Sequence, residues 1–293
     1  MVIRKFAAID IGSNAIRLLI NNVIEQENKP TAFKKSELVR VPVRLGEDAF
    51  LRGKISERNV DRLVSTMKSF DLLMQVYGVE KYMACGTSAL REAKNGREVV
   101  ERVMKETGMK IELIDGKKEA LIIASTDLKD IIKNDRMYLY VDVGGGSTEF
   151  TIFDKGKPVM SHSFKIGTVR ILSNLVDDTV WEEIKAWIKT NVPMDGKLEI
   201  IGSGGNINKL HKMSGRKIGQ PLSYIWLNAQ YHFLNSMAYE DRISELGLNQ
   251  DRADVIIPAT KIFLNAAKWS KAKKIHVPKI GLADGMIKTL YYQ

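Results

Sequence analysis

The sequence predicts an α/β protein made of two duplicated lobes, and three observations support this. The chain has 293 residues, about two domain lengths. Apolar runs typical of strands alternate along it with amphipathic helical segments. An aspartate–glycine turn between two apolar runs occurs twice, and its aspartates, Asp10 and Asp142, are 132 residues apart (142 − 10 = 132). That spacing is close to a domain length and far above a solenoid period, so we expect a duplicated domain.

The first lobe is predicted to open with a β-hairpin over residues 7–20, because aliphatic runs flank a glycine-containing turn. Residues 57–77 place apolar side chains at spacings of three and four, which predicts an amphipathic helix. Residues 81–85 are predicted to form a buried strand that ends at Cys85, residues 98–107 a helix and residues 111–114 another strand.

The second lobe repeats the hairpin over residues 139–153. Further helices are predicted at 180–190, 206–213, 254–269 and 282–291, and strands at 198–201 and 275–277. We expect lobes at 1–128 and 129–293, with the C-terminal helix at about 282–293 as a candidate to pack back on the first lobe. A crossing near residues 125–134 is expected to act as a hinge beside a central cleft.

Composition narrows the classes of partner. Lys plus Arg number 45 against 35 Asp plus Glu, giving a net charge of +10 and a pI near 9.4, which favours a polyanionic partner such as nucleic acid, an acidic membrane or polyphosphate. No apolar run approaches the length that spans a bilayer and the N-terminus lacks a signal-peptide pattern, so a cytoplasmic protein without membrane association is expected. Nucleic acid is disfavoured because no helix-turn-helix, zinc-finger or RNP signature occurs.

Other side-chain types exclude further chemistry. A single cysteine excludes an internal disulfide and a CxxC metal or redox motif. The four histidines have no metal-ligand spacing, so structural roles are expected for them; they are His162, His211, His232 and His276.

The two aspartate–glycine turns suit phosphate chemistry. Glycines let successive backbone N–H groups point at one anion, hydroxyl groups add donors, and the aspartate can hold a cation or its waters. The second turn fits this pattern with Gly144, Gly145, Gly146, Ser147 and Thr148. A tight hairpin without a ligand is the alternative for one turn alone, and the duplication favours phosphate.

Five motifs in order resemble the exopolyphosphatase / guanosine pentaphosphate phosphohydrolase (Ppx/GppA) family over essentially the whole chain. They are IDIGSN at 9–14, TSALREAKNG at 87–96, VDVGGGSTE at 141–149, GSGGN at 202–206 and ADVIIPATKIF at 253–263 with GLADG at 281–285. The resemblance implies the actin-like, ribonuclease H-like (ASKHA) superfold, with two lobes around a phosphate-binding cleft. It also implies Mg²⁺-dependent hydrolysis of the terminal phosphoanhydride of inorganic polyphosphate, of guanosine pentaphosphate, or of both.

The resemblance assigns roles to carboxylates. Glu119, in the segment 114–120, would orient and deprotonate the attacking water, and its alternative is a solvated residue in the first turns of a helix. Asp142 would hold Mg²⁺, and Glu149 would be a second catalytic group that orients water or metal. Asp10 would share the metal or brace its own turn. Lys118 stands where the family has the first of two glutamates.

Phosphate contacts follow in the same way. Arg91 matches the arginine that grips the transferred phosphate, with a surface ion pair to Glu92 or Glu98 as the alternative. By resemblance, Gly12, Ser13 and Asn14 contact the same phosphate, and Gly204 and Gly205 form a second glycine-rich turn for a nucleotide or for further phosphates.

Two other functions stay open at this stage: a metabolite kinase of the same superfold, and a non-catalytic protein that binds polyphosphate or an alarmone. The preferred substrate, the processivity without the family's additional C-terminal domain and the choice between monomer and homodimer also stay open.

Overall fold

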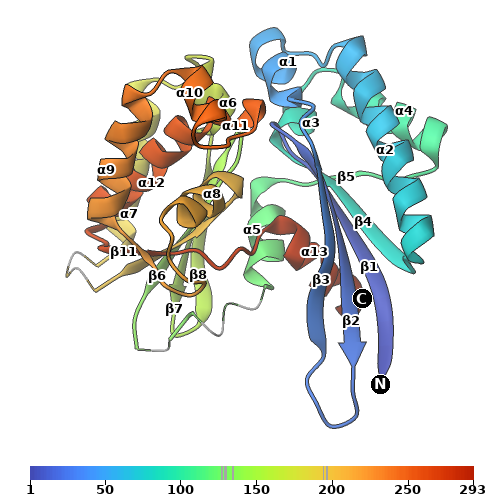
Figure 1. Cartoon of the computed structure of the whole chain (residues 1–293), viewed down its shortest axis with the longest axis horizontal. Coiled ribbons are helices and arrows are strands. Elements are labelled where there is room, and N and C mark those ends of the chain that lie inside the picture. The colour runs from blue at the N-terminus through green and yellow to red at the C-terminus, as the bar shows by residue number, and fades with distance from the viewer. Residues whose placement is uncertain (127, 129–130, 134, 194, 196) are drawn as a thin grey trace. The chain divides into compact units, whose positions relative to one another are not determined.

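The computed structural model places the chain in two compact units, Met1–Thr126 with Leu282–Gln293, and Asp127–Gly281. It describes residues 1–126, 128, 131–133, 135–193, 195 and 197–293. The crossing expected at 125–134 and the boundary expected at 128/129 fall partly on residues 127, 129, 130 and 134, which lie outside the described residues. Each unit is one mixed sheet with helices (Figure 1), so the predicted α/β fold of two duplicated lobes is confirmed.

Unit 1 contains a five-stranded sheet in the order β3-β2-β1-β4-β5. Its strands are β1 (Val2–Ile11), β2 (Ile16–Glu25), β3 (Ala32–Val41), β4 (Lys81–Gly86) and β5 (Glu112–Leu113). Its helices are α1 (Leu45–Arg52), α2 (Glu57–Tyr77), α3 (Ser88–Glu92), α4 (Gly96–Thr107), α5 (Gly116–Ala124) and α13 (Leu282–Tyr292). The β1–β2–β3 meander is antiparallel, whereas β4 runs parallel to β1, and β5 parallel to β4.

The core of unit 1 lies between α2, α4 and one face of the sheet. Helix α2 spans the residues that its apolar spacing predicts, and it buries Leu63, Met67 and Phe70. Its side chains pack against alternate residues of β1 and β2, such as Ile9 and Leu18. Alternate residues of β1 and β2 therefore contribute apolar side chains to this core.

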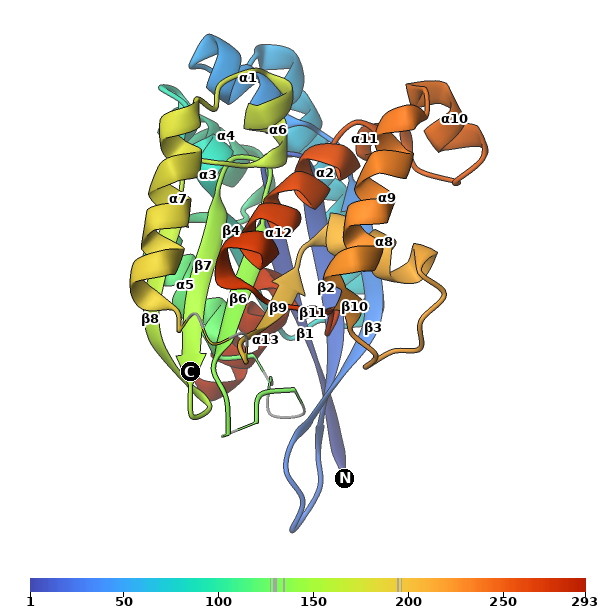
Figure 2. The ribbon, with the colours of Figure 1, turned by 90° about the vertical axis from the view of Figure 1, so that its left-hand side faces the viewer.

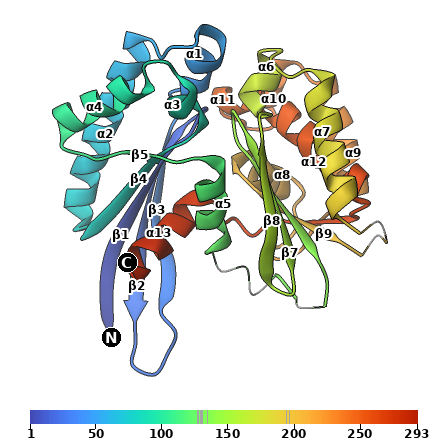
Figure 3. The same cartoon turned by 180° about the vertical axis from the view of Figure 1, so that it is seen from behind.

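Helix α13 belongs to unit 1 although it ends the chain. It contacts α5, β1, β2 and β4 (Figure 3). Gly285 permits this packing, because a Cβ at that position would overlap the Ile122 carbonyl group of α5. The glycine of the GLADG motif thus allows two helices to approach closely.

Unit 2 contains a six-stranded sheet in the order β10-β11-β9-β6-β7-β8. Its strands are β6 (Tyr138–Val143), β7 (Thr148–Asp154), β8 (Lys157–Phe164), β9 (Glu199–Ser203), β10 (Leu222–Ser223) and β11 (Lys274–His276). Its helices are α6 (Thr168–Leu172), α7 (Asp178–Asn191), α8 (Gly205–Met213), α9 (Tyr224–Ser236), α10 (Tyr239–Ser244), α11 (Gln250–Ala253) and α12 (Ile256–Ser270).

Helices α7, α12 and α9 lie side by side over one face of the unit 2 sheet (Figure 2). Helix α12 supplies the centre of this core with Ile262 and Phe263, which meet Ile184 of α7 and Leu227 of α9. Helix α7 is capped by Asp177, whose side chain accepts the amides of Thr179 and Val180.

The two hairpins have the same register. In unit 1, Asp10 pairs with Arg17 across β1 and β2, and the Gly12 amide donates to the Ala15 carbonyl at 3.1 Å. In unit 2, Asp142 pairs with Glu149 across β6 and β7, and the Gly144 amide donates to the Ser147 carbonyl at 3.0 Å. Adding 132 to each residue of the first hairpin gives its counterpart in the second, so the duplication extends to individual hydrogen bonds.

Strands β3 and β8 are absent from the sequence prediction. Both lie at an edge of their sheets, and most of their residues are exposed or half-buried. Among the helices that the structure describes, none combines the length and hydropathy needed to span a bilayer.

Candidate active site

Three strands of unit 1 end at the same edge of its sheet and bring the predicted residues together. The Thr87 amide donates to the Ile11 carbonyl at 3.2 Å, and the Ile114 amide donates to the Gly86 carbonyl at 3.1 Å. The turn after β1, the start of α3 and the start of α5 are thereby adjacent. Carboxyl ends of parallel strands are where open α/β sheets bind ligands.

The first glycine turn is held by its own unit. The carbonyl of Ser13 accepts the Gly46 amide at 2.8 Å, and the carbonyl of Asn14 accepts the Arg44 amide at 3.0 Å. The hydroxyl of Ser13, a residue 3% exposed, lies 3.1 Å from the Ser88 hydroxyl of α3. The turn and α3 are therefore joined by a side-chain contact as well as by the sheet.

Asp10 lies beside a cation within the same hairpin. Its carboxylate accepts Nη1 of Arg17 at 3.4 Å. Burial raises the pKa of Asp10, and the Arg17 guanidinium offsets only part of that effect. The structure thus gives Asp10 an ion pair with Arg17, the residue directly opposite it in β2. Both roles left open for Asp10, sharing the metal and bracing the turn through backbone N–H groups, stay predictions.

Glu119 is buried, with 9% of its surface exposed, so it is not a solvated helix residue. Asp115 caps α5 by accepting the Lys118 amide at 2.8 Å, which fixes the first turn that carries Glu119. The Lys118 ammonium is paired with Glu112. The positive charge that replaces a family glutamate is therefore balanced within the same unit.

Arg91 ties α3 to the segment that carries Glu119. Its Nη1 donates to the Ile114 carbonyl at 2.6 Å. A guanidinium has five N–H donors, so this bond leaves donors for a phosphate. The structure gives this backbone contact to Arg91 where the sequence offered an ion pair with Glu92 or Glu98 as the alternative.

Cys85 is fully buried in β4, as predicted. Its strand neighbours are Asp10 and Glu112. Burial, with the negative charges of Glu112 and Asp10 adding to it, raises the pKa of the thiol to about 12. A thiol that stays protonated at neutral pH is no nucleophile.

The second glycine turn is held by hydrogen bonds to its carbonyl groups. The amides of Thr168 and Val169 donate to the carbonyls of Gly144 and Gly145 at 3.0 and 2.9 Å, and Nε of Arg170 donates to the Gly146 carbonyl at 2.6 Å. Within the described part of the chain, no acceptor is assigned to the amides of Gly145 and Gly146. The carbonyl oxygens of the turn thus already accept hydrogen bonds, whereas two of its amide N–H groups remain as donors. This is the arrangement that binds an anion.

Two carboxylates stand at the base of this turn. Asp142 and Glu149 occupy directly opposite positions of β6 and β7. Glu149 is 2% exposed, and its Oε1 accepts the hydroxyls of Ser147 at 2.7 Å and Ser163 at 2.8 Å. Gly204 approaches the other carboxylate: a Cβ there would lie 3.5 Å from Oδ1 of Asp142 and 2.9 Å from the Val143 carbonyl oxygen.

Gly204 and Gly205 connect β9 to α8. Gly204 has φ +109°, a conformation that L side chains rarely adopt, and it precedes the first residue of α8, Gly205. Glycine at 204 is thus required both by its backbone conformation and by its approach to the hairpin.

Thr148, which was predicted to contact phosphate, is fully buried, and its hydroxyl donates to the Ile166 carbonyl at 2.6 Å. The Thr148 hydroxyl is therefore engaged within its own unit, and its contact with phosphate stays a prediction. Its neighbour Ser147 differs, since its hydroxyl reaches Glu149 at the base of the turn.

The carboxylates of unit 2 fit a magnesium ion better than those of unit 1. Mg²⁺ is usually held by one or two carboxylates, with waters and substrate oxygens completing its shell. Asp142 and Glu149 supply two, whereas Asp10 faces the guanidinium of Arg17. Across the described residues, no group of three or more His, Cys, Asp or Glu side chains could form a metal cage.

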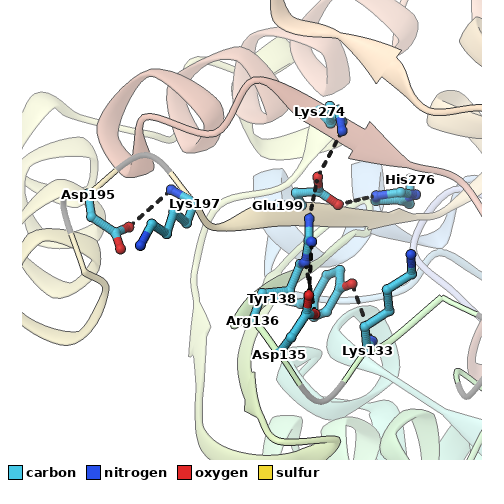
Figure 4. A network of polar contacts seen from close by, with 9 residues as sticks. All are labelled: Lys133, Asp135, Arg136, Tyr138, Asp195, Lys197, Glu199, Lys274 and His276. Atoms are coloured by element: carbon cyan, nitrogen blue, oxygen red, sulfur yellow. Dashed lines mark hydrogen bonds and ion pairs between the residues drawn. The ribbon is translucent and has the colours of Figure 1, made fainter.

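A separate polar network lies at the opposite ends of β6 and β9 (Figure 4). Glu199 accepts Nε2 of His276 at 2.7 Å and is paired with Arg136 at 3.1 Å and Lys274 at 3.2 Å. Although burial raises the pKa of Glu199, hydrogen bonds from His276 and Lys274 outweigh it and lower the pKa. His211 bonds the Gln220 carbonyl at 2.9 Å and His162 packs on Phe164, so these histidines have the structural roles expected.

Three residues of unit 2 near the turn were missed by the sequence analysis. Gly167 lets the start of α6 approach the glycine turn, Arg170 donates to the turn, and Ser163 donates to Glu149. A glycine followed by a short polar–apolar run at 167–170 is a weak local signal, and nothing local marks Ser163.

Known proteins resemble this chain over most of its length. The family model of the Ppx/GppA phosphatase family matches residues 37–291. Exopolyphosphatase 1 of Mycobacterium tuberculosis is 24% identical over 303 residues, covering 97% of this chain and 87% of the relative. A bifunctional 3-dehydroquinate synthase/phosphatase of Fusobacterium nucleatum is 36% identical over 202 residues, which are 64% of this chain and 30% of that protein.

Solved structures also resemble this chain over nearly its whole length. An exopolyphosphatase from Cytophaga hutchinsonii superposes with a TM-score of 0.86 at 26% identity, covering 98% of this chain and 97% of the other. The Aquifex aeolicus Ppx/GppA family member superposes with a TM-score of 0.78 at 23% identity, covering 99% and 98%. Because the family model spans most of the sequence and these folds match over nearly all of it, the chain belongs to the Ppx/GppA phosphatase family.

Proposed function

We propose that this chain is a phosphoanhydride hydrolase that releases the terminal phosphate of inorganic polyphosphate, with guanosine pentaphosphate as a second substrate carrying the same bond. The observation that carries the proposal is the carboxylate pair Asp142–Glu149 at the base of a glycine turn whose carbonyls are already occupied. Relatives named exopolyphosphatase and a net charge of +10, which suits a polyanion, support it.

Unit 2 supplies phosphate and metal contacts in this proposal. The amides of Gly145 and Gly146 donate to phosphate oxygens, and Ser147 adds a hydroxyl. Asp142 and Glu149 hold Mg²⁺, which when bound neutralises charge on the phosphate group. The Gly204–Gly205 turn binds a further phosphate of the substrate.

Unit 1 carries the residues to which the resemblance assigns the attacking water and the transferred phosphate, and their roles are proposed here for that unit by itself. Glu119 accepts a proton from the water, a role that needs a carboxylate held in one place. The remaining N–H groups of the Arg91 guanidinium bind oxygens of the transferred phosphate, while its Nη1 donates to the Ile114 carbonyl. The first turn contributes Gly12, Ser13 and Asn14.

The non-catalytic alternative is not favoured, because relatives of this chain are named exopolyphosphatases. Lys118, which stands where the family has the first of two glutamates, is paired with Glu112 at the surface. Glu119, the next residue, is buried.

The test is a phosphate-release assay with Mg²⁺ and either polyphosphate or guanosine pentaphosphate. We expect release by the wild type and at least a 100-fold lower kcat for Glu119→Gln, as general-base catalysis contributes roughly 10²- to 10⁴-fold. Glu101→Gln, an exposed site on α4, is the matched control and should keep full activity. Binding of polyphosphate without any release would contradict the hydrolase and support a binding protein.

A further inference from the structure

Glu149 lies in the middle of a row of polar residues that spans three strands. Strand β7 lies between β6 and β8, so Glu149 has a neighbour on each side, Asp142 and Ser163. Residues opposite one another in neighbouring strands share one face of a sheet. The resemblance to the family assigns catalytic and metal-binding roles to the two carboxylates of this row, Asp142 and Glu149. It assigns no role to Ser163, the third residue of the row.

Ser163 faces Glu149 because β8 contains a bulge. The register between β7 and β8 shifts by one residue between Ile152 and Phe153. Counted from the pair Asp154–Lys157 at the turn, an unbroken ladder would place His162 opposite Glu149, and the shift places Ser163 there. A one-residue shift exchanges the two faces of a strand, and bulges often re-aim a side chain beside an active site.

The contact restricts the Glu149 carboxylate. Oε1 accepts the Ser163 hydroxyl at 2.8 Å and the Ser147 hydroxyl at 2.7 Å. The terminal torsion of a glutamate is broad, so a carboxylate needs partners to hold one orientation. Hydroxyl donors to a carboxylate are also stronger than neutral hydrogen bonds, which suits a side chain that is buried and lies opposite Asp142.

The two serines are not equivalent. Ser147 belongs to the glycine turn, and its hydroxyl is needed for phosphate in the proposed function. Ser163 belongs to a strand, and the proposed function gives its hydroxyl no contact with phosphate. When Ser147 turns to a substrate oxygen, Ser163 is the hydroxyl that still orients Glu149.

We infer that Ser163 is a positioning residue of the phosphohydrolase reaction, which acts by holding the Glu149 carboxylate in one orientation. This inference rests on the proposed function. It assigns to the β8 bulge the task of bringing a strand hydroxyl to a carboxylate of the site.

Ser161 offers a matched control. It lies two residues earlier on β8, on the same face, and its hydroxyl is 3.0 Å from the Thr151 hydroxyl. Its replacement by alanine removes the same atom from the same strand and leaves Glu149 untouched.

The experiment compares Ser163→Ala, Ser163→Thr and Ser161→Ala in steady-state phosphate release with Mg²⁺ and polyphosphate. We expect kcat to fall roughly 10-fold for Ser163→Ala with KM within twofold, since one hydrogen bond to a charged group is lost. Ser163→Thr keeps the hydroxyl and should restore most of kcat, and Ser161→Ala should match the wild type. In a Glu149→Gln background, Ser163→Ala should cause no further loss.

A second measurement needs no turnover. In protein labelled with ¹³C at glutamate Cδ, the signal assigned by its absence in Glu149→Gln should move in Ser163→Ala and stay in place in Ser161→Ala. An active wild type whose Ser163→Ala variant keeps its kcat, or an unmoved Glu149 signal, would overturn the role of Ser163 alone. A wild type that releases no phosphate would overturn the proposed function and the role of Ser163 with it.

Discussion

Replacing Gly167 by alanine should disturb the glycine turn of unit 2 without removing any polar group. A Cβ at 167 would lie 2.5 Å from the backbone nitrogen of Gly146 and closer still to the Gly145 carbonyl. Real Cβ atoms essentially never come within 3.0 Å of another heavy atom, and the nearest atom, the Gly145 carbonyl oxygen, would lie at 2.3 Å, so the two segments must separate by at least about 0.7 Å. Because Gly167 has φ −155°, which any residue adopts, the effect is steric alone.

The size of the effect follows from what has to move. The obstructing atoms are backbone, so no rotamer change relieves the overlap, and overpacking of this kind costs about 1–3 kcal/mol. For a unit of this size each kcal/mol lowers the melting temperature by roughly 2–4 °C, so a fall of about 2–12 °C is expected. Displacement of the turn toward 1 Å should lower kcat by up to about 100-fold.

The assay combines calorimetric melting with phosphate release. Gly281→Ala is the control, because its Cβ would meet only the Ser203 hydroxyl, at an ordinary distance of 3.7 Å. A Gly167→Ala protein that melts and turns over like the wild type would refute the steric argument. It would also remove the support from α6 that we assign to the turn.

Three further outcomes are expected. Burial raises the pKa of Asp10 above its ordinary value of 3.8, so ionisation of Asp10 lowers the free energy of unfolding as the pH rises above that value. Asp10→Asn should therefore resist urea better than the wild type at pH 7, and the difference between the two unfolding free energies should shrink below pH 4. The lowered pKa of Glu199 has the opposite sign: its stabilisation is present above about pH 4.5 and lost in acid, so Glu199→Gln should lose about 1.5–3 kcal/mol at pH 7, measured by urea unfolding, and little at pH 3. Affinity for polyphosphate, measured by titration, should fall as salt rises; a constant affinity would contradict binding through many charge contacts.

The fold was predictable where burial leaves a periodic pattern. Helix α2 spans residues 57–77 as predicted, since its apolar stripe faces a sheet along its whole length. Strands β3 and β8 were not predictable, because an edge strand is held by its backbone ladder and can expose most of its side chains. Hydrophobic pattern carries no information about such a strand.

The candidate site divides in the same way. In each of the two turns the aspartate and the glycines are close together in the sequence, so the sequence alone places them at the same turn. Ser163 differs, because it meets Glu149 only through a register shift within the β7–β8 ladder. Gly167 depends equally on a segment more than twenty residues away. Thr148 shows the converse: its residue type suits phosphate, whereas its place at the start of a buried strand directs the hydroxyl to the Ile166 carbonyl.

The duplication itself indicates which hairpin is better suited to a metal ion. Equivalent positions carry Arg17 in the first hairpin and Glu149 in the second, so Asp10 has a basic residue opposite it and Asp142 has a second acidic residue. Opposed like charges destabilise a strand pair, and a bound cation removes that cost.

Magnesium should therefore stabilise the metal-free protein through unit 2. At ten times the dissociation constant, the stabilisation is about 1.4 kcal/mol, which corresponds to roughly 3–6 °C in melting temperature. Asp142→Asn should abolish this rise, and Asp10→Asn should keep it, because Asp10 is already paired with Arg17. If Asp10→Asn abolished the rise and Asp142→Asn did not, the first hairpin would hold the metal, and charge at the cross-strand position would have no bearing on where the ion binds.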